Sequence, residues 1–227
     1  GKTLAVMLGG TAAERSISLQ SGENVARALE QDGANVLRVD PAEKDWPERL
    51  KEASFVFNLL HGPGGEDGTV QGLFELMKLP YSGCGLLASA LTMDKIRTKW
   101  VWQGVGLPTP AFEVLEANTD WQAIIEALGT VFVKPALEGS SLGMSKATSG
   151  AELEASFLQA SGYGTEVMAE QFVSGAEYTV AILGDKTLPS IRIDVPGEFY
   201  DFDAKYRSEE TCFTCPSDLT ADEEAAL

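Results

Sequence analysis

Three short apolar runs in the first third of the chain alternate with segments of helical spacing. Each run is bounded by Gly, Pro or Asp, which is typical of buried strands. Between and after them, apolar side chains recur every three or four residues, as on one face of a helix. This strand–helix rhythm predicts a parallel, Rossmann-like α/β sheet. The predicted strands are residues 3–8, 35–39 and 54–60, with a helix from 70 to 77.

The middle of the chain mixes longer helical patterns with isolated strands. Residues 86–103 predict one helix, followed by a hinge-like break at 104–110. Capping-box patterns at 119–122 and 149–152 predict the starts of two further helices. The Gly-Asp dipeptide at 184–185 is typical of a hairpin turn. Strands are expected at 131–134, 167–172, 178–183 and 188–195.

The last segment contains a long polar and aromatic stretch, residues 196–211. We expect it to be a loop, and loops of that length inside compact domains often act as lids. A capping-box pattern at 220–223 predicts a helix, and the sequence ends at Leu227. One hairpin and the start of a helix are too little for an independent core. We therefore expect this last domain to continue beyond the sequence given.

Composition narrows the class of protein. A hydrophobic content of 44% is typical of globular domains, and no apolar run has the length that spans a bilayer. The chain opens on a strand-like run without a signal-like segment, so we expect a cytoplasmic protein with no membrane partner. A net charge of −17 repels a phosphate backbone and argues against a nucleic-acid partner. A few local lysines could still bind a small anion.

The three cysteines do not indicate a disulfide framework or a metal site. Their odd, sparse number suits a reducing compartment. Cys212 and Cys215 have zinc-type spacing, but no second pair exists and His61 is the only histidine. Since structural zinc needs four ligands, no metal ligands are expected in this chain.

Glycine-rich stretches follow the first and third predicted strands. Ligands of open α/β sheets bind at the carboxyl ends of strands, so both stretches are predicted to face one crevice. Glu14 in the first stretch could hold an ammonium group, although an acid favoured by a helix N-terminus is the alternative. The second stretch, 61–68, has four glycines, and its His61 alone does not establish a catalytic role.

A small, hydroxyl-bearing loop follows the strand at 131–134. Backbone N–H groups and the Ser140 hydroxyl could fold over phosphates, with Lys134 supplying charge and Lys95 a second cation. Solvated surface lysines are the alternative. Farther along, Glu170 and Glu177 bracket an apolar stretch that could cover a nucleotide base and accept hydrogen bonds from its ribose.

Taken together and in order, these motifs resemble the D-alanine–D-alanine ligases of the ATP-grasp superfamily. The matching strings cover almost the whole chain, and their order makes a chance match remote. They are LGGTAAERSISLQSG from Leu8, HGPGGEDGTVQG from His61, PYSGCG from Pro80, MDKIRTK from Met93, VKPALEGSSLGMSK from Val133, EQFVSGAEYTVAILG from Glu170, LPSIRI from Leu188 and YDFDAKY from Tyr200.

The resemblance implies a domain plan and a reaction. A Rossmann-like substrate-binding domain would span 1–91, and a central ATP-grasp domain 92–175. Residues 176–227 would begin an incomplete catalytic ATP-grasp domain, with its lid at 196–211. The implied reaction joins two D-alanines for peptidoglycan synthesis. The first carboxylate takes the γ-phosphoryl group of ATP, and the second amine attacks the resulting D-alanyl phosphate.

The resemblance also implies roles for individual residues. Glu14 would bind the ammonium group of the first D-alanine, and His61 would lie near its carboxylate. Ser140 and Tyr206 would complete the catalytic set with Glu14 by closing the lid. The residues implied to contact ATP are Lys95 and Lys134 at the phosphates, Glu170 and Phe172 at adenine, Glu177 at the ribose, and Ser140 and Lys205 at phosphate.

This sequence departs from the family pattern in three places. Gln171 and Phe172 stand where basic and Trp residues are frequent, and Leu137 replaces a basic residue of some relatives. The sequence also ends before the magnesium carboxylates and the oxyanion-stabilising Arg of the family. We therefore expect ATP and Mg²⁺ as cofactors, with the metal ligands outside this chain.

Two alternatives stay open, and one partner is implied. A sister ligase would make D-alanyl-D-lactate, although its lid Tyr is typically replaced, so Tyr206 favours an amine acceptor. A non-catalytic ligand-binding fragment or pseudoenzyme is the second alternative. The family is usually dimeric, so a homodimer is expected.

Overall fold

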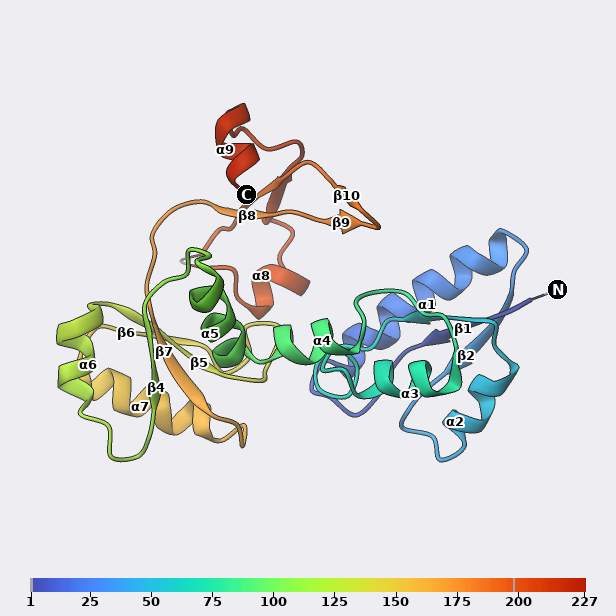
Figure 1. The fold of residues 1–227 in the computed structure, drawn as a ribbon, viewed down its shortest axis with the longest axis horizontal. Coiled ribbons are helices and arrows are strands. Elements are labelled where there is room, and N and C mark those ends of the chain that lie inside the picture. The colour runs from blue at the N-terminus through green and yellow to red at the C-terminus, as the bar shows by residue number, and fades with distance from the viewer. Residues whose placement is uncertain (1, 198) are drawn as a thin grey trace. The chain divides into compact units, whose positions relative to one another are not determined.

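The computed structural model describes residues 2–197 and 199–227. The chain divides into two compact parts, Gly1–Gln171 and Phe172–Leu227. Figure 1 shows helices and sheets in both. Residue 1 of the predicted first domain and residue 198 of the predicted lid lie outside the described residues. The domain boundaries at 91 and 175 stay predictions.

The first compact part opens with the predicted alternation of strands and helices. β1 is the central strand of a parallel sheet with the order β2–β1–β3, which confirms the Rossmann-like expectation. The elements are β1 (Thr3–Met7), α1 (Arg15–Gln31), β2 (Asn35–Val39), α2 (Trp46–Arg49), a 3-10 turn (Leu50–Glu52), β3 (Phe55–Asn58) and α3 (Thr69–Met77).

The two faces of this sheet pack against different helices. Successive side chains of a strand point to opposite faces. Val6 and Leu8 pack with Ala26 of α1, whereas Ala5 and Met7 pack in the cluster that contains Phe74 of α3. Because β1 is covered on both faces, it reads as one continuous apolar run in the sequence.

The helix predicted over 86–103 is in fact two helices, α4 (Leu86–Met93) and α5 (Lys95–Val105). Asp94 between them has an extended backbone, with φ −86° and ψ 100°. Its carboxylate accepts a hydrogen bond from the backbone N–H of Arg97 at 3.0 Å and so caps α5. Apolar periodicity continues through this residue, but the capping chemistry of Asp94 ends one helix and begins the next.

A four-stranded antiparallel sheet follows, with the order β4–β7–β5–β6. Helices α6 and α7 cover one face through a core that includes Val131 and Val133, while Ile96 of α5 packs on Ala136 and Met168. Figure 1 shows these elements in green to light orange. They are β4 (Phe112–Leu115), α6 (Trp121–Leu128), β5 (Val131–Pro135), β6 (Ser145–Ala147), α7 (Gly150–Ser161) and β7 (Val167–Gln171).

The capping predictions for this region are partly wrong. Asp120, not Thr119, caps α6 by accepting from the N–H of Ala123, because the Thr119 hydroxyl accepts from the N–H of Glu116 instead. Ser149 caps α7 as expected. The short edge strands β4 and β6 were not predicted, because three or four residues give too little periodicity.

The second compact part contains the predicted hairpin. β9 and β10 pair across the turn at Gly184, and β8 and β11 pair outside them. The 196–211 segment is not only loop, because Asp201 caps the short helix α8 by accepting from the N–H of Ala204. The elements are β8 (Glu177–Thr179), β9 (Ile182–Leu183), β10 (Lys186–Thr187), β11 (Ile191–Asp194), α8 (Phe202–Tyr206), β12 (Cys212–Thr214) and α9 (Ala221–Ala226).

The predicted capping box at the start of α9 is confirmed. The Thr220 hydroxyl accepts from the N–H of Glu223, and the Glu223 carboxylate accepts from the N–H of Thr220 at 2.9 Å. Glu224 then accepts from the N–H of Ser190 at 2.7 Å, which ties α9 to the sheet of this part. Among the described residues, no helix has the length and hydrophobicity to cross a bilayer.

Candidate functional site

Glu14 is a buried carboxylate that has no ion-pair partner among the residues that the structure describes. It lies at the N-cap position of α1 but makes no side-chain capping bond there. Glu14 is only 1% exposed, and neither oxygen of its carboxylate has a hydrogen-bond partner within the described residues. Burying an unpaired carboxylate costs several kcal/mol. The helix-cap alternative does not explain this burial, whereas a cationic ligand would supply the missing partner.

Two glycines from different loops approach the Glu14 carboxylate. A Cβ added at Gly62 would lie 2.7 Å from Oε2 of Glu14, and Gly62 has φ +67°. A Cβ added at Gly139 would lie 3.2 Å from Oε1 of Glu14 and 4.0 Å from Oε2 of Glu66. The loop after β3 and the loop after β5 therefore meet at Glu14. Glycine permits this close approach at both positions.

Two sets of hydrogen bonds fix the turn that carries Glu14. The buried Ser18 hydroxyl accepts from the N–H of Gly9 at 2.9 Å and donates to the carbonyl oxygen of Leu59 at 2.6 Å. Asp40 accepts from the N–H of Gly10 and forms an ion pair with Arg15. That guanidinium, outweighing the burial that opposes it, lowers the pKa of Asp40 to about 2.

His61 lies in a loop that is shaped by its own carboxylates. Glu66 accepts from the N–H of Gly62 at 2.7 Å, and Asp67 accepts from the N–H groups of Gly64 and Thr69. Burial alone would raise the pKa of Asp67, but these backbone donors lower it. Half-buried His61 lines a cavity of about 50 Å³ together with residues of the Gly10 turn. The predicted meeting of the two glycine-rich stretches is therefore present.

Ser140 lies beside Gly139 in the loop after β5. Ser140 and Ser141 both have left-handed backbones, with φ of 53° and 59°. For non-glycine residues this conformation costs about 1–2 kcal/mol each. Such strain is concentrated at functional sites. In the same loop, burial first, and then the nearby Glu14 charge, raise the pKa of Glu138, although Lys95 opposes both.

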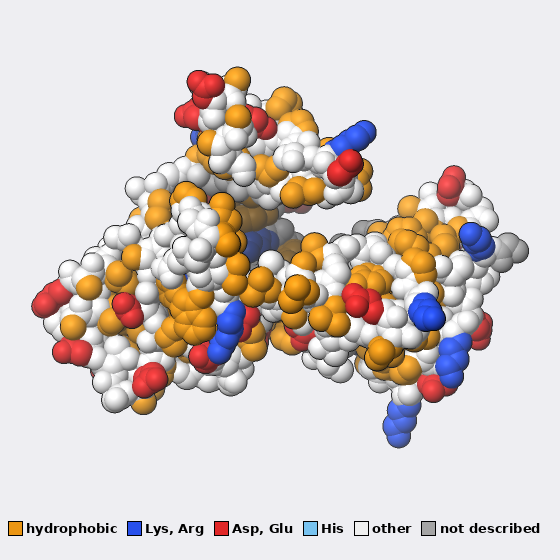
Figure 2. All heavy atoms as spheres, viewed as in Figure 1, with side chains coloured by type: hydrophobic (Ala, Val, Ile, Leu, Met, Phe, Trp, Pro, Cys, Tyr) orange, Lys and Arg blue, Asp and Glu red, His pale blue; other side chains and the backbone are white. Residues whose placement is uncertain are grey.

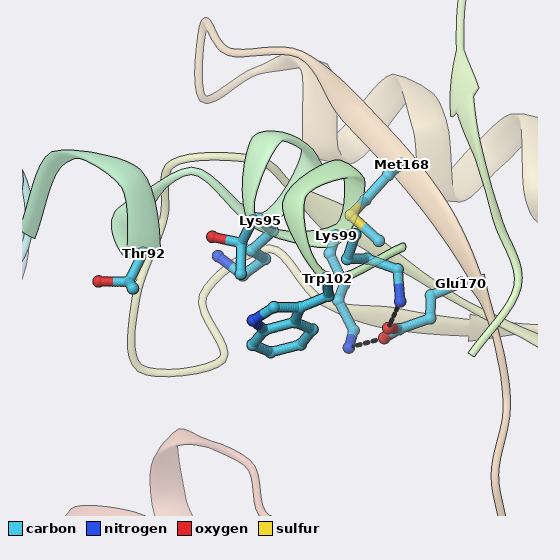
Figure 3. Close-up of a pocket in the computed structure, with 8 residues that line it drawn as sticks. Thr92, Lys95, Lys99, Trp102, Met168 and Glu170 are labelled. Atoms are coloured by element: carbon cyan, nitrogen blue, oxygen red, sulfur yellow. Dashed lines mark hydrogen bonds and ion pairs between the residues drawn. The ribbon is translucent and has the colours of Figure 1, made fainter. Parts of the chain in front are cut away.

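A second cluster lies on the face of the antiparallel sheet that α5 covers. Since Val131 and Val133 of β5 face the helices α6 and α7, period-two alternation turns Lys134 to the opposite face. The same alternation in β7 turns Met168 and Glu170 there. These side chains line a cavity of about 410 Å³ with residues of α4 and α5, as Figure 3 shows. The lining residues are Thr92, Lys95, Thr98, Lys99, Trp102, Lys134, Met168 and Glu170.

Two lysines form ion pairs with Glu170. Lys99 Nζ lies 2.6 Å from Oε1, and Lys134 pairs with Oε2. Both dashed contacts meet at the carboxylate in Figure 3. Burial alone would raise the pKa of Glu170, but the charges and hydrogen bonds of Lys134 and Lys99 lower it. Lys95 Nζ instead donates to carbonyl oxygens of the loop after β5, those of Ala136 and Glu138.

The sequence predictions missed Lys99 and Trp102. Lys99 is 3% exposed, so it is not one of the solvated lysines that a charged helix position usually indicates. A signal existed in the sequence, because Lys95, Lys99 and Trp102 recur at helical spacing and share one face of α5. Lys95, Lys134 and Glu170, in contrast, were predicted and line one cavity.

The remaining predicted residues lie in the second compact part. Lys205 Nζ lies 5.2 Å from the Tyr200 ring centroid, and the Tyr206 and Phe202 rings are 4.9 Å apart. Burial, and then Tyr206 and Glu177, raise the pKa of Tyr200. Within the second compact part, the side chains of Tyr200, Phe202, Lys205 and Tyr206 are therefore neighbours. The predicted roles of Glu177, Lys205 and Tyr206 toward ligands, and that of half-buried Phe172, are not tested by this arrangement.

No group of three or more His, Cys, Asp or Glu side chains that could hold a metal ion occurs within residues 2–197 and 199–227.

Some large apolar side chains are exposed on the first compact part. Leu76 of α3 is 85% exposed and Leu87 of α4 is 77% exposed. Figure 2 shows hydrophobic side chains gathered over α4 and α5.

Comparisons with known proteins agree on one family. The family model described as "D-ala D-ala ligase N-terminus" matches residues 38–84, and the one described as "D-ala D-ala ligase C-terminus" matches residues 101–227. A protein of Aromatoleum aromaticum named D-alanine–D-alanine ligase is 51% identical, over 99% of this chain and 73% of its own length.

Solved structures show the same relationship. D-alanine–D-alanine ligase from Bacillus anthracis is 30% identical with a TM-score of 0.85, covering all of this chain and 76% of its own. The complex of the Bacillus anthracis enzyme with ATP has a TM-score of 0.82 at 28% identity, over 100% of this chain and 75% of that one. The α/β ATP-grasp architecture expected from the sequence is therefore confirmed.

Proposed function

The chain belongs to the D-alanine–D-alanine ligase family of ATP-dependent ligases, and on that premise we propose how its residues serve the reaction. The Glu14 pocket binds the first D-alanine, and the cavity between α5 and the antiparallel sheet binds ATP. The product is D-alanyl-D-alanine for peptidoglycan synthesis. The unpaired Glu14 carboxylate is the observation on which this assignment depends, because an α-ammonium group supplies the cation that its surroundings lack.

The cavity lined by α5 suits a nucleotide triphosphate. This cavity contains three lysines, Lys95, Lys99 and Lys134, whereas the whole chain has a net charge of −17. The cavity is therefore more positive than the protein surface as a whole. Trp102 and Met168 supply an apolar wall, as an adenine base requires. Glu170 supplies acceptors for the adenine amine. Glu177 would accept from the ribose hydroxyls, and Phe172 would cover the base.

The chemistry requires two steps. A carboxylate is a poor electrophile, so one oxygen of the first D-alanine attacks the γ-phosphorus and the bond to the β-phosphate oxygen breaks, releasing ADP. The amine of the second D-alanine then attacks the acyl carbon, loses a proton and expels phosphate. The acyl phosphate reacts readily with water, so the site must close. We assign this closure to Ser140 and Tyr206, with Lys205 holding phosphate and His61 near the substrate carboxylate.

ATP carries charge that requires further cations, and we propose Mg²⁺ for this role. The described residues do not fit it, because they contain no group of three or more His, Cys, Asp or Glu side chains that could hold a metal ion. The three cysteines are unpaired and exposed, which suits a reducing cytoplasm, where we place the reaction.

We further propose a homodimer. Exposed Leu76 and Leu87, on neighbouring helices α3 and α4, offer apolar surface for a second copy. Light scattering is expected to give twice the chain mass of 24.3 kDa. A monomer at micromolar concentration would contradict the dimer without affecting the catalytic proposal.

The test of the catalytic proposal is direct. In a protein that carries this chain together with the rest of its catalytic domain, ATP, Mg²⁺ and D-alanine should give ADP and D-alanyl-D-alanine in equal amounts, as measured by mass spectrometry. D-lactate as second substrate should give little product. A Ser140→Ala variant should lose roughly 10–100-fold in turnover, since it removes one hydrogen bond to a charged group. Ser141→Ala is the matched control, because it also has a left-handed backbone.

Either of two results would contradict the proposal. Undiminished dipeptide formation by a folded Ser140→Ala variant would remove the assigned role of that hydroxyl. Binding of D-alanine and ATP without any ADP formation, by the protein with its complete catalytic domain, would instead indicate a ligand-binding protein.

A further inference from the structure

We propose that Lys99 is the permanent counter-ion of Glu170, and that it holds this carboxylate in place while Lys134 turns from Glu170 to the nucleotide phosphates. Lys99 would then be a positioning residue, because it acts through its neighbours. The inference rests on the proposed nucleotide site.

The ammonium group of Lys99 is held by two hydrogen bonds and lies near an aromatic ring. Its Nζ donates to Oε1 of Glu170 and to Oγ1 of Thr109, both at 2.6 Å, and lies 5.0 Å from the ring centroid of Phe112. The side chain is only 4% exposed. Moving this ammonium group would break both hydrogen bonds and leave it desolvated without a partner. A buried charge in that state is strongly destabilising, so Lys99 stays with Glu170.

Lys134 is held less firmly than Lys99. Its side chain is 19% exposed and its Nζ pairs with the other oxygen of Glu170, while the ring centroid of Phe132 lies 5.9 Å away. It stands on β5 directly before the strained loop that carries Ser140. Rotation of its flexible side chain brings the ammonium group to a different anion without moving the strand.

The two lysines therefore have different roles: Lys99 stays paired with Glu170, and Lys134 is able to bind phosphate. If Glu170 had only Lys134, transfer of Lys134 to a phosphate would leave a buried carboxylate unpaired, and the nucleotide would have to compensate for that cost. With Lys99 in place, Glu170 keeps one cation throughout. The phosphates then gain an interaction with the Lys134 ammonium group, and the Glu170 carboxylate that contacts the base keeps Lys99 as its partner.

The experiment compares two ligands that differ only in their phosphates. Calorimetric titration of the whole protein with ADP and with adenosine is done for wild type and for Lys99→Met. Without Lys99, Lys134 is retained by Glu170, so ADP should bind about tenfold more weakly. Adenosine affinity should stay within about threefold, because adenosine makes no demand on Lys134. Lys44→Met, at an exposed position, is the control for the same change in net charge.

A purely structural role for Lys99 predicts a different pattern. It would weaken ADP and adenosine alike, or lower the melting temperature with no change in either affinity, and both results would overturn the inference. If Lys99→Met does not fold, Lys99→Gln keeps a hydrogen bond without the charge and should show the same selective loss for ADP. Lys99→Arg should restore ADP binding.

Failure of the inference and failure of the proposed function are distinguishable. Wild-type protein that binds neither ligand would contradict the nucleotide site itself. Wild-type binding of ADP with equal binding by Lys99→Met would leave the nucleotide site intact and overturn only the role of Lys99.

Discussion

Glu14, at the start of α1, and Glu170, on the inner strand β7, are both largely buried carboxylates, and their surroundings are opposite. Glu14 has no hydrogen-bond partner within the described residues, and glycines from two loops crowd it. Glu170 pairs with Lys99 on one oxygen and with Lys134 on the other. The carboxylate of Glu14 carries a negative charge that no described residue pairs with, whereas the cavity of Glu170 already contains its cations.

This difference separates two strategies for binding. A pocket with an unbalanced carboxylate selects a ligand that carries its own cation, such as an amino acid with a free ammonium group. A pocket with resident lysines selects a ligand that brings negative charge and a polar edge, such as a nucleotide. In the function that we propose, the same residue type thus serves two recognition tasks, and its neighbours decide which.

Neutralising each of the two carboxylates in turn is expected to give the largest effect. Glu170→Gln should lower the free energy of unfolding by about 3 kcal/mol, because it leaves the buried Lys99 without its counter-ion. Glu14→Gln should leave that free energy unchanged or raise it, since it removes an uncompensated charge. Urea denaturation at pH 7 measures both values.

Ligase activity adds the second half of that prediction. Glu14→Gln should lose at least about a hundredfold in kcat/KM for the first D-alanine, because the ammonium group loses its ion pair. Equal destabilisation by the two variants would show that Glu14 has a cationic partner of its own, and the contrast between the pockets would disappear.

A smaller effect is expected from crowding the Glu14 pocket. Gly62→Ala and Gly64→Ala both place a side chain at positive φ, so each should lose about 1 kcal/mol of stability. Only the Cβ at position 62 would meet Glu14, while the one at 64 has no atom within 4 Å. Steady-state kinetics should show a KM for D-alanine raised roughly tenfold in Gly62→Ala alone. Similar KM values for both variants would contradict the close approach.

The smallest effect concerns Asp40, whose ion-pair partner Arg15 has a side chain that is 41% exposed. Its pKa in the folded protein is about 2, below the ordinary value of about 4. The pair with Arg15 therefore stabilises the fold above pH 4 and loses this contribution as the pH falls from about 4 toward 2. After solvent screening we expect roughly 1 kcal/mol.

Chemical denaturation at pH 5 and at pH 2.5 measures this contribution. Asp40→Asn should lack that part of the acid destabilisation and otherwise unfold like the wild type. If wild type and variant lose stability in parallel between the two pH values, Asp40 is not the group responsible.

The sequence predicted those features that depend on local chemistry or on one strand at a time. The parallel sheet follows from the doubly buried run of β1, and the α9 capping box from Thr220 and Glu223. Lys134 was predicted from its place at the end of a strand, and Glu170 from the apolar stretch that it brackets with Glu177. The break at Asp94 was missed because apolar spacing continues across it, and β4 and β6 were missed because short edge strands carry little pattern.

The meeting of the two glycine-rich stretches was predicted, but the atomic contacts between distant segments could not be predicted in the same way. The state of Glu14 depends on Gly62 and Gly139, which lie far from it in the sequence. The burial of Lys99 depends on Glu170, which comes from another element. In a sequence alone, a lysine on an amphipathic helix looks like any solvated lysine. The ligand-binding and catalytic roles of all the predicted site residues, Phe172, Glu177, Lys205 and Tyr206 included, stay predictions.

The Ser18 hydroxyl has a consequence for ligand design. One oxygen atom sets the separation between the turn after β1 and the end of β3, through bonds of 2.9 Å and 2.6 Å. The turn that carries Glu14 is thus held to the end of β3 by one shared hydroxyl group. An inhibitor designed for the proposed amino-acid site should therefore be shaped to this turn as to a fixed template.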